Sequence, residues 1–572
     1  MADFRDPPKE LSLPTRLPLV GVLDNRGGVA DLDARIVNGF VERTPTGSVR
    51  IVKRPGMARV SQNTDANVLG AGMIEGYACW RDTLSAPTDR IRLYSVDPET
   101  SALTLLGFVA STPDGSLLPF EWMEQVPVGS TEEILLLLNP IGAMTYDEFG
   151  IRAIERAGTG VSIICSITSG SPVVTHTSDR PASYFRVTGT GIPAGTTILS
   201  IDSTTQFTLS KNATATNASA TLLITSEAPN TSYQINNEYS DTYVSPSTYY
   251  AGGIVVLNKS VYLGLGNGRI HGSDADAPRD WSPLNFISPY AERGLLLFIS
   301  RQHSHLIAFK EFSTEFFRDA GLTDGSPLER VEGLQLDVGA LNKRVVQVFA
   351  QTVVWMSNNR ESERSVYLLQ GLRAKEIAGP AEKRVLATGD DWISVGLTTA
   401  GHSFFVLTSV ELGVSLVFDL DSELWSYWNA LGQTYFPFSA ACPADSGDVL
   451  LQHMTDGWLY LMGEGLFKDQ TYPIVMDVYP PEFDGGMRVS KYLTKMFIVG
   501  DQQEGSELKV RVNDHNRTAQ YWSSWRTFDL SKGRPRLDEC GSFYKRAFHF
   551  RHESATPCRL EFVELDIQPG TL

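Results

Sequence analysis

A short apolar run, followed by a polar turn and a second strand, returns along this chain every 45 to 51 residues. Repeats of that length are typical of stacked or radial β-units. Residues 415–426 show the pattern most clearly, because an apolar strand leads through a polar turn into a strand that carries Trp425. The steps between successive runs are 45, 47, 51 and 45 residues, and the runs centre on Tyr262, Ile307, Val354, Phe405 and Leu450. The repeat predicts the blades of a β-propeller.

The length and composition fit a globular protein of several domains. A chain of 572 residues exceeds what one core supports, so we expect two to four domains at about 150 residues each. The 42% hydrophobic and 20% charged content is ordinary, and 49 glycines with 30 prolines suit many short strands and tight turns. Helical periodicity is weak, apart from one short candidate at 146–156. The chain is therefore predicted to be all-β.

The charge balance limits what the surface can bind. There are 66 acidic and 49 basic residues, and the formal net charge is −17. Sequence-independent binding of nucleic acids depends on neutralising phosphates with lysine and arginine. The bulk surface is therefore not expected to hold DNA.

Cysteine usage and hydropathy indicate neither a metal centre nor a membrane anchor. We expect no secretory signal, because the N-terminal residues are polar and acidic. The longest apolar run, 134–138, is much too short to cross a bilayer. Five cysteines at no metal-ligand spacing are predicted to be reduced and mostly buried: Cys79, Cys165, Cys442, Cys540 and Cys558.

Shifts in composition predict five segments. Residues 158–226 are rich in Ser, Thr, Ala and Gly and almost uncharged, which indicates an inserted module, and their alternating runs favour a small β-sandwich. The full expected order is an N-terminal arm with the first strands (1–60), the first propeller blade or blades (61–157), the inserted β-sandwich-like module (158–226), the main propeller repeats (227–470), and C-terminal strands that close the propeller or form a platform (471–572).

No pattern in the sequence supports catalysis. Phosphate-binding loops of the Walker type, nucleophile elbows and Cys-x-x-Cys pairs are all missing. Asp274, Asp276 and Asp280 lack the glycine and distal glutamate of a calcium loop, and His303 with His305 lacks further ligands at a known spacing. We therefore expect no enzyme activity, no cofactor and no metal.

Two groups of side chains are candidates for contacts. Lys53 and Arg54 form a short basic turn that could touch nucleic acid or a neighbouring subunit. Tryptophans at equivalent places in successive units are expected to pack between blades, although they could also line a sugar platform. These are Trp281, Trp355, Trp425 and Trp458.

Several phrases taken in order resemble one protein family. They are Val-Asn-Gly-Phe at 37–40, Lys-Arg-Pro-Gly at 53–56, the run 268–274 with Trp281, the runs 306–309 and 314–317, Trp-Ser-Ser-Trp at 522–525, and Phe-Tyr-Lys-Arg at 543–546. Together they resemble the tail hub or nozzle proteins of short-tailed bacteriophages, a family that includes packaged-DNA stabilisation and head-completion proteins. The resemblance spans most of the chain except 158–226.

The resemblance implies a structural virion protein, made in the cytoplasm of the bacterial host. Six copies would form a ring in the tail below the portal and adaptor proteins, next to tailspike, fibre or needle proteins. An acidic channel would retain the packaged double-stranded DNA and conduct it, without sequence specificity, during ejection. Two alternatives stay open: a receptor-binding or tailspike-docking protein, and a sialidase-like glycosidase propeller, although the repeated Ser-x-Asp-x-Gly-x-Thr-Trp turns of such enzymes are missing.

Overall fold

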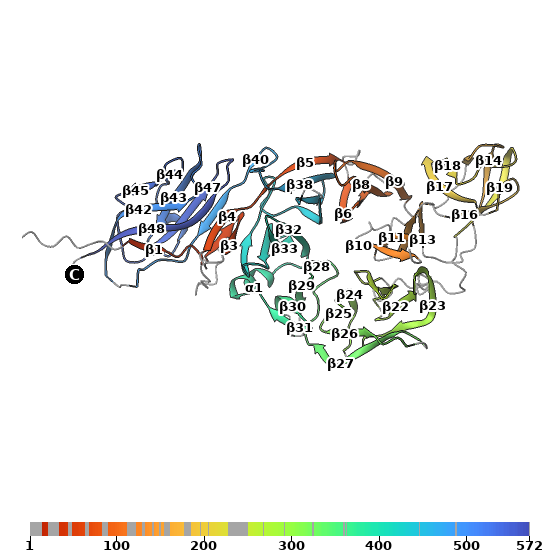
Figure 1. The fold of residues 1–572 in the computed structure, drawn as a ribbon, viewed down its shortest axis with the longest axis horizontal. Coiled ribbons are helices and arrows are strands. Elements are labelled where there is room, and N and C mark those ends of the chain that lie inside the picture. Colours follow the sequence, from red (N-terminus) through yellow and green to blue (C-terminus); the bar gives the residue numbers. More distant parts are fainter. Residues whose placement is uncertain are drawn as a thin grey trace, which may run out of the picture.

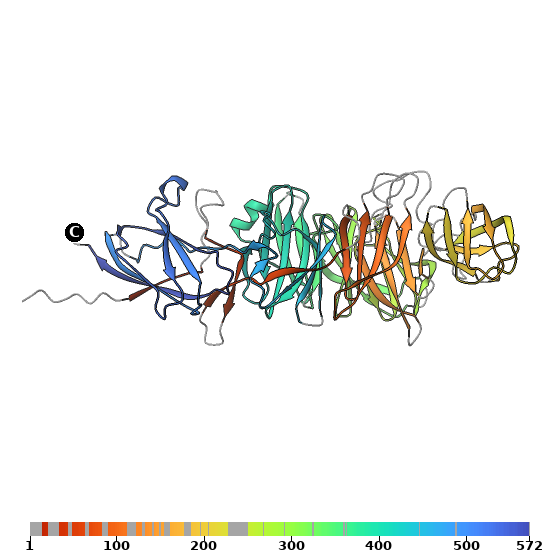
Figure 2. The same ribbon diagram turned by 90° about the horizontal axis from the view of Figure 1, so that it is seen from above.

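A computed structural model of the chain defines the architecture. It describes residues 14–20, 34–43, 49–62, 68–82, 90–110, 122–128, 132–139, 142–147, 150–153, 161–176, 185–194, 196–203, 205–226, 250–266, 268–290, 292–322, 325–349, 351–358, 361, 363–444, 447–486 and 489–570. Nearly all of the regular structure within them is β-sheet, as predicted. Three bodies follow one another along the long axis: a C-terminal sandwich at one end, a propeller in the middle and a small barrel at the other end (Figures 1 and 2).

The propeller has seven four-stranded blades in the described part of the chain. Two blades precede the barrel: β6 (Val68–Ile74), β7 (Tyr77–Asp82), β8 (Arg90–Val96) and β9 (Leu103–Ala110), then β10 (Trp122–Val128), β11 (Glu132–Asn139), β12 (Gly142–Asp147) and β13 (Gly150–Ala153). The short helix considered at 146–156 is wrong, since its described residues, 146–147 and 150–153, belong to the antiparallel strands β12 and β13.

Four further blades follow the barrel in sequence order. Their strands are β20 (Val255–Leu257), β21 (Ser260–Gly264), β22 (Ile270–Asp274) and β23 (Ala277–Ile287); β24 (Leu296–Gln302), β25 (His305–Lys310), β26 (Thr314–Asp319) and β27 (Leu328–Leu336); β28 (Val346–Phe349), β29 (Thr352–Asn358), β30 (Arg364–Gln370) and β31 (Arg373–Glu376); and β32 (Ile393–Thr399), β33 (His402–Ser409), β34 (Val414–Asp419) and β35 (Leu424–Tyr427). Helix α1 (Pro380–Leu386) links the last two of them. It has seven residues, and no helix among the described residues is long and apolar enough to span a bilayer.

The seventh blade closes the ring with a strand from the N-terminal region. Its first three strands are β36 (Phe438–Pro443), β37 (Val449–His453) and β38 (Trp458–Gly463). The fourth is β5 (Gly56–Gln62), which pairs antiparallel with β38. Strand β36 lies beside β6 of the first blade, so the seventh blade meets the first. Two short strands, β39 (Lys468–Asp469) and β40 (Tyr472–Pro473), extend this sheet beyond β5.

The inserted module is a closed barrel. Its strands are β14 (Val161–Ile167), β15 (Val173–His176), β16 (Phe185–Thr188), β17 (Thr196–Ser203), β18 (Gln206–Leu209) and β19 (Asn217–Ser226). We expected two facing sheets, but β19 pairs with both β14 and β16, so the strands form one continuous ring. Its core is built from the module's own residues, with Phe207 fully buried.

The C-terminal sandwich combines strands from both ends of the chain. One sheet contains β1 (Pro14–Leu17), β3 (Gly39–Arg43), β4 (Val49–Lys53), β48 (Arg559–Pro569), β42 (Lys491–Gly500), β45 (Arg536–Asp538) and β46 (Ser542–Phe543). The other runs through β2 (Arg35–Val37), β41 (Met476–Tyr479), β47 (Ala547–His552), β43 (Glu507–Asn513) and β44 (Arg526–Asp529), with the 3₁₀ turn η4 (Ala519–Tyr521) between the last two in sequence. Their inner faces share one apolar core.

This sandwich corrects the expectation for the N-terminal residues and decides between the two roles considered for 471–572. The described strands before residue 54 belong to the sandwich and not to a separate arm. The strands after residue 475 do not close the propeller, because β5 does. Strand β2 also pairs with β35 of the sixth blade through Val37 and Tyr427, so one nine-stranded sheet runs from the propeller into the sandwich.

Candidate functional site

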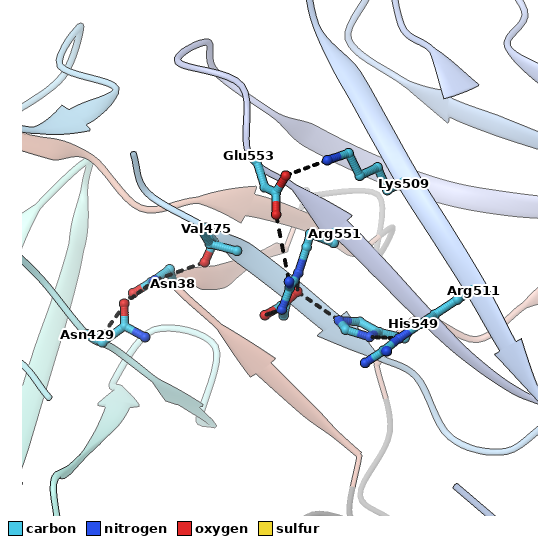
Figure 3. Close-up of polar contacts among 9 residues, drawn as sticks. Asn38, Asn429, Val475, Lys509, Arg511, His549, Arg551 and Glu553 are labelled. Atoms are coloured by element: carbon cyan, nitrogen blue, oxygen red, sulfur yellow. Dashed lines mark hydrogen bonds and ion pairs between the residues drawn. The ribbon is translucent and has the colours of Figure 1, made fainter. Parts of the chain in front are cut away.

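A polar junction fixes the sandwich against the propeller. At its centre is Asn38, which has a left-handed backbone (φ 53°), a conformation that asparagine tolerates better than most residues. Its Nδ2 donates to Asn429 Oδ1 at 2.7 Å and to the Val475 carbonyl at 2.9 Å (Figure 3). Its Oδ1 accepts from the Asn429 amide and from Arg54 Nε, both at 3.0 Å. The Asn38 side chain thus connects the N-terminal segment to Asn429, which follows the sixth blade, and to Val475, which precedes strand β41 of the sandwich.

Arg54 is a second fixed point of the junction and is fully buried. Its Nη1 and Nη2 donate to the two carboxylate oxygens of Asp469 at 3.0 and 2.5 Å. The same nitrogens also donate to the Pro55 and Asn429 carbonyls. Such a planar, bidentate arrangement is the strongest kind of arginine–carboxylate contact. Arg54 is therefore committed inside the chain and is not available to DNA.

Lys53 is also internal, with 6% of its surface exposed. Its Nζ donates to the Ser554 carbonyl at 2.8 Å and lies 3.3 Å from Nδ1 of His552. Burial lowers the pKa of Lys53 to about 8 and, with the nearby Lys53 charge, lowers the pKa of His552 to about 3. The suggestion that this basic turn reaches nucleic acid is wrong, because both charged groups are buried, that of Arg54 in the junction and that of Lys53 against His552 and Ser554 of the sandwich.

The outer face of the second sandwich sheet gathers charged and aromatic side chains. In β43 the inward positions are Leu508 and Val510, which are buried, while Lys509 and Arg511 alternate outward. Strands β47 and β41 follow the same alternation and place His549 with Arg551, and Asp477 with Tyr479, on that face. Residues from three strands therefore meet on one surface.

We define the aromatic–arginine cluster as Tyr479, Arg511, Trp522, Trp525, His549 and Arg551. The Arg511 guanidinium carbon lies 4.8 Å from the Trp522 ring centre and 4.6 Å from that of Trp525. The Arg551 guanidinium lies 5.3 Å from the Trp525 ring, and His549 stacks on Tyr479 at 4.0 Å. Cation–π contacts of this kind are favourable even near the surface.

His549 lies at the centre of the cluster, and its hydrogen bonds fix its ring in one tautomer. Arg511 Nε donates to Nδ1 at 2.9 Å, so Nδ1 carries no proton and Nε2 donates to Asp477 Oδ1 at 2.7 Å (Figure 3). Burial lowers the pKa of His549, which keeps it neutral. Burial of Asp477 is outweighed by the hydrogen bonds from His549 and Arg551, and its pKa is lowered. Of the cluster residues, only Trp522 and Trp525 belong to a phrase noted in the sequence, Trp-Ser-Ser-Trp at 522–525.

The tryptophans singled out from the sequence lie in or against the blades. Trp281 and Trp355 are buried, and their indole nitrogens donate to the Pro278 and Gly339 carbonyls at 3.0 and 3.1 Å. Trp425 and Trp458 are half-buried. The Trp425 nitrogen donates to the Ile377 carbonyl at 2.8 Å, and the Trp458 ring lies under the Arg59 guanidinium at 5.0 Å. The structure does not bring the four together as one platform.

A group of residues that was not considered in the sequence has the composition of a metal site. His402, Asp419 and Asp421 have ligand atoms within 4.8 Å of one another. However, Asp419 already contacts His402 Nδ1 at 2.9 Å and accepts from Ser422 Oγ at 2.7 Å, while Asp421 accepts from the Ser403 amide at 2.9 Å. These hydrogen bonds join the start of β33 to the turn that follows β34, at the open end of the β33–β34 hairpin.

The groups considered earlier as metal ligands lie in blade turns and strand ends. Asp276 pairs with Lys259 at 2.7 Å, Asp274 ends β22, and Asp280 lies in β23. His303 is in the turn before β25 and His305 begins that strand. Among the described residues, neither group has the convergent ligand atoms found around His402.

Comparison with known proteins links the propeller to a bacteriophage family. Residues 180–400 match the family model described as bacteriophage P22 Gp10, β-propeller, which is less than half of the chain. The match begins inside the barrel module and ends in the sixth blade. No curated protein matches the chain.

Solved structures similar to the chain include BamB from Moraxella catarrhalis and the N-terminal domain of Nup159. BamB is 10% identical, with a TM-score of 0.33 over 72% of this chain and 98% of that one. The Nup159 domain is 9% identical, with a TM-score of 0.31 over 75% of this chain and 99% of that one. At these TM-scores neither adds to the argument.

Proposed function

We propose that this chain is a structural subunit of a bacteriophage tail, in the hub or nozzle that lies below the portal and adaptor. The observation that carries the proposal is the match of residues 180–400 to the P22 Gp10 β-propeller family. The match includes three complete blades, β20 to β31, together with part of the barrel. No enzymatic role is included in the proposal.

In this role several copies, six by analogy with the family, form a closed ring around a channel for the genome. The rigid junction at Asn38 and Arg54 supports the role, because a subunit of fixed shape presents its end modules at fixed positions in a ring. The net charge of −17 also fits, since an acidic wall repels the phosphates of passing DNA. The ring would retain packaged DNA in the virion and conduct it during ejection.

The first test is the mass and symmetry of the purified protein, alone and mixed with the portal and adaptor complex of its virion. Light scattering and particle imaging are expected to find a ring, formed alone or on the adaptor. A chain that stays monomeric and never docks would contradict the proposal. Once the ring is imaged, carboxylates on its wall can be changed to lysine. Ejection is then expected to slow, and unchanged kinetics would contradict the electrostatic part of the proposal.

A second candidate function is docking of a tailspike or host receptor by the barrel module. The barrel has its own core and lies at the far end of the propeller from the sandwich (Figure 2). On its outer face Ile164 is 57% exposed and Leu223 is 39% exposed, on paired strands β14 and β19. Deleting 161–226 separates the two candidates, because a nozzle subunit would still assemble and retain genome, whereas a receptor binder would lose adsorption.

A further inference from the structure

We propose that Arg511 anchors a contact between copies of this chain by binding a carboxylate side chain of the neighbouring copy. The inference rests on the proposed ring and names the surface that would build it. Arg511 is held in place by contacts within its own chain, yet its two terminal nitrogens donate to no acceptor in the part of the chain that the structure describes.

Three contacts fix the Arg511 guanidinium in place. Trp522 and Trp525 flank it at 4.8 and 4.6 Å, and its Nε donates to His549 Nδ1 at 2.9 Å. The backbone of Arg511 is paired with that of His549 across β43 and β47. An arginine is normally flexible, and ordering it on binding costs side-chain entropy. The Arg511 side chain is already largely ordered, so binding of a carboxylate would lose less side-chain entropy and would be tighter.

The outer edge of the guanidinium is open. Among the described residues, Nη1 and Nη2 of Arg511 have no hydrogen-bond acceptor, and the side chain is half-buried. The nearby carboxylate of Asp477 does not serve as this acceptor, because it already accepts one hydrogen bond from His549 and two from Arg551. By contrast, both terminal nitrogens of Arg546, in the same sandwich, donate to acceptors within the chain.

The geometry favours a single carboxylate over nucleic acid. Two coplanar N–H groups match the two oxygens of Asp or Glu. Binding to a phosphate backbone depends on many cations, whereas Arg551 and Lys509 beside Arg511 are already paired with Asp477 and Glu553. Bases would also need free aromatic faces for stacking, but Arg511 already lies against both indoles.

A second copy of the chain supplies the required charge. Each copy carries 66 acidic and 49 basic residues, so a free cation on one copy faces surplus carboxylates on the next. A ring is held by a heterologous contact, in which two different patches of the same chain meet. Tryptophan, tyrosine and arginine are the residues most enriched at the energetic centres of protein interfaces, and the aromatic–arginine cluster contains all three.

The test compares Arg511→Gln with Arg534→Gln in the full-length protein. Arg534 is a matched control, because it lies in the same sandwich, stacks on Phe497 at 4.2 Å and is 66% exposed. Assembly is followed against concentration by light scattering. We expect Arg511→Gln to raise the half-assembly concentration by at least about tenfold, and Arg534→Gln to leave it unchanged. Arg511→Lys, which keeps the charge but loses the planar fork, should give an intermediate value.

A second measurement identifies the occupant without disturbing Arg511. A photo-crosslinking amino acid replaces Tyr521, which is 50% exposed next to Trp522 in sequence. Crosslinking in assembled rings should give dimers of this chain, joined through a peptide that contains Asp or Glu. Crosslinks to another protein alone, or none at all, would overturn the inference.

The outcomes separate this inference from the proposed function. Wild-type rings with equal assembly of Arg511→Gln and Arg534→Gln would overturn the inference and leave the nozzle proposal standing. A wild-type protein that forms no ring, either alone or with the portal and adaptor complex, would overturn both. If Arg511→Gln proves unfolded by thermal melting, Arg511→Lys and the crosslink at position 521 decide the question.

Discussion

Arg54 and Asp469 are 415 positions apart in the sequence, yet they form a bidentate ion pair whose side chains are 0% and 3% exposed. The pair joins the chain just before β5 to strand β39, at the place where the propeller is closed and the sandwich begins. One contact between distant parts of the chain therefore supports both the closure of the propeller and the junction.

Replacing Asp469 by Asn is expected to destabilise the fold by about 3–5 kcal/mol, because it leaves the buried Arg54 charge without its counter-ion. The control is Asp276→Asn, since the partner of Asp276, Lys259, is 60% exposed and such pairs contribute about 0–1 kcal/mol. Urea unfolding monitored by tryptophan fluorescence measures both variants. Equal midpoints would show that the Arg54–Asp469 pair is not a main stabilising contact.

Closure of the propeller by β5 predicts a large effect at Met57, which is 1% exposed and pairs with Met462. Met57→Ala should cost about 2–5 kcal/mol and make the seventh blade sensitive to proteolysis. Leu105→Ala, at a position 47% exposed in β9, should change stability by no more than about 0.5 kcal/mol. Thermal melting and limited proteolysis compare the two, and similar behaviour would argue against closure by β5.

The buried Lys53 predicts a gain of stability at alkaline pH. Its pKa is about 8 in the folded chain and about 10.4 in an unfolded one, so the unfolded state binds more protons between these values. Stability should therefore rise from pH 8 to pH 10.4, by about 3 kcal/mol from this group. The difference in unfolding free energy between wild type and Lys53→Met, measured across that range, isolates the effect. A constant difference would contradict it.

His552 predicts the opposite limit, a loss of stability in acid. Its pKa falls from about 6.5 in the unfolded chain to about 3 in the fold, where it is buried beside Lys53. The stability that depends on a neutral His552 is complete above pH 6.5 and declines as the pH falls toward 3, by about 4–5 kcal/mol. His552→Gln should flatten this acid limb in urea titrations. An identical acid limb in the variant would assign the loss to other groups.

The barrel is expected to fold as an isolated fragment, because its core cluster contains only its own residues. A peptide of residues 161–226 should show a β-sheet circular dichroism spectrum and a cooperative thermal transition. Phe207→Ala, at a fully buried position, should abolish the transition, whereas Ile164→Ala, on the exposed outer face, should preserve it. A fragment without cooperative melting would show that the barrel depends on the propeller.

The propeller could be predicted from the sequence because of where its apolar runs lie. Tyr262, Ile307, Val354, Phe405 and Leu450 all fall in the second strand of a blade. That strand is buried on both faces between neighbouring blades, so it forms a continuous apolar run instead of an alternating one. The repeat length is therefore the distance in sequence between the second strands of successive blades.

The pairing of the terminal strands could not be predicted in the same way. A strand's alternation tells which side chains face the core, but it does not tell which strand lies alongside. Strand β5 pairs with β38, about four hundred residues later, and β4 pairs with β48 near the other end. The same limit explains why the alternating runs of 161–226 fitted a sandwich as well as the barrel that they form.

The aromatic–arginine cluster was missed for a related reason. The alternation of Leu508, Lys509, Val510 and Arg511 does mark an outward face in the sequence. However, His549 and Tyr479 reach that face from strands nearly forty and about thirty residues away. Only the fold shows that their rings and the Arg511 guanidinium share one surface.

Closure of the ring by β5 also has a consequence for how the protein is made. The ribosome synthesises residues 56–62 long before their partner, residues 458–463, so this strand emerges with its hydrogen-bonding edge unpaired. Strand β4 is synthesised before β5, and its partner β48 is synthesised after β38. The propeller therefore reaches its native closure only after most of the chain has been translated, and prematurely terminated chains are left with open strand edges and a tendency to aggregate.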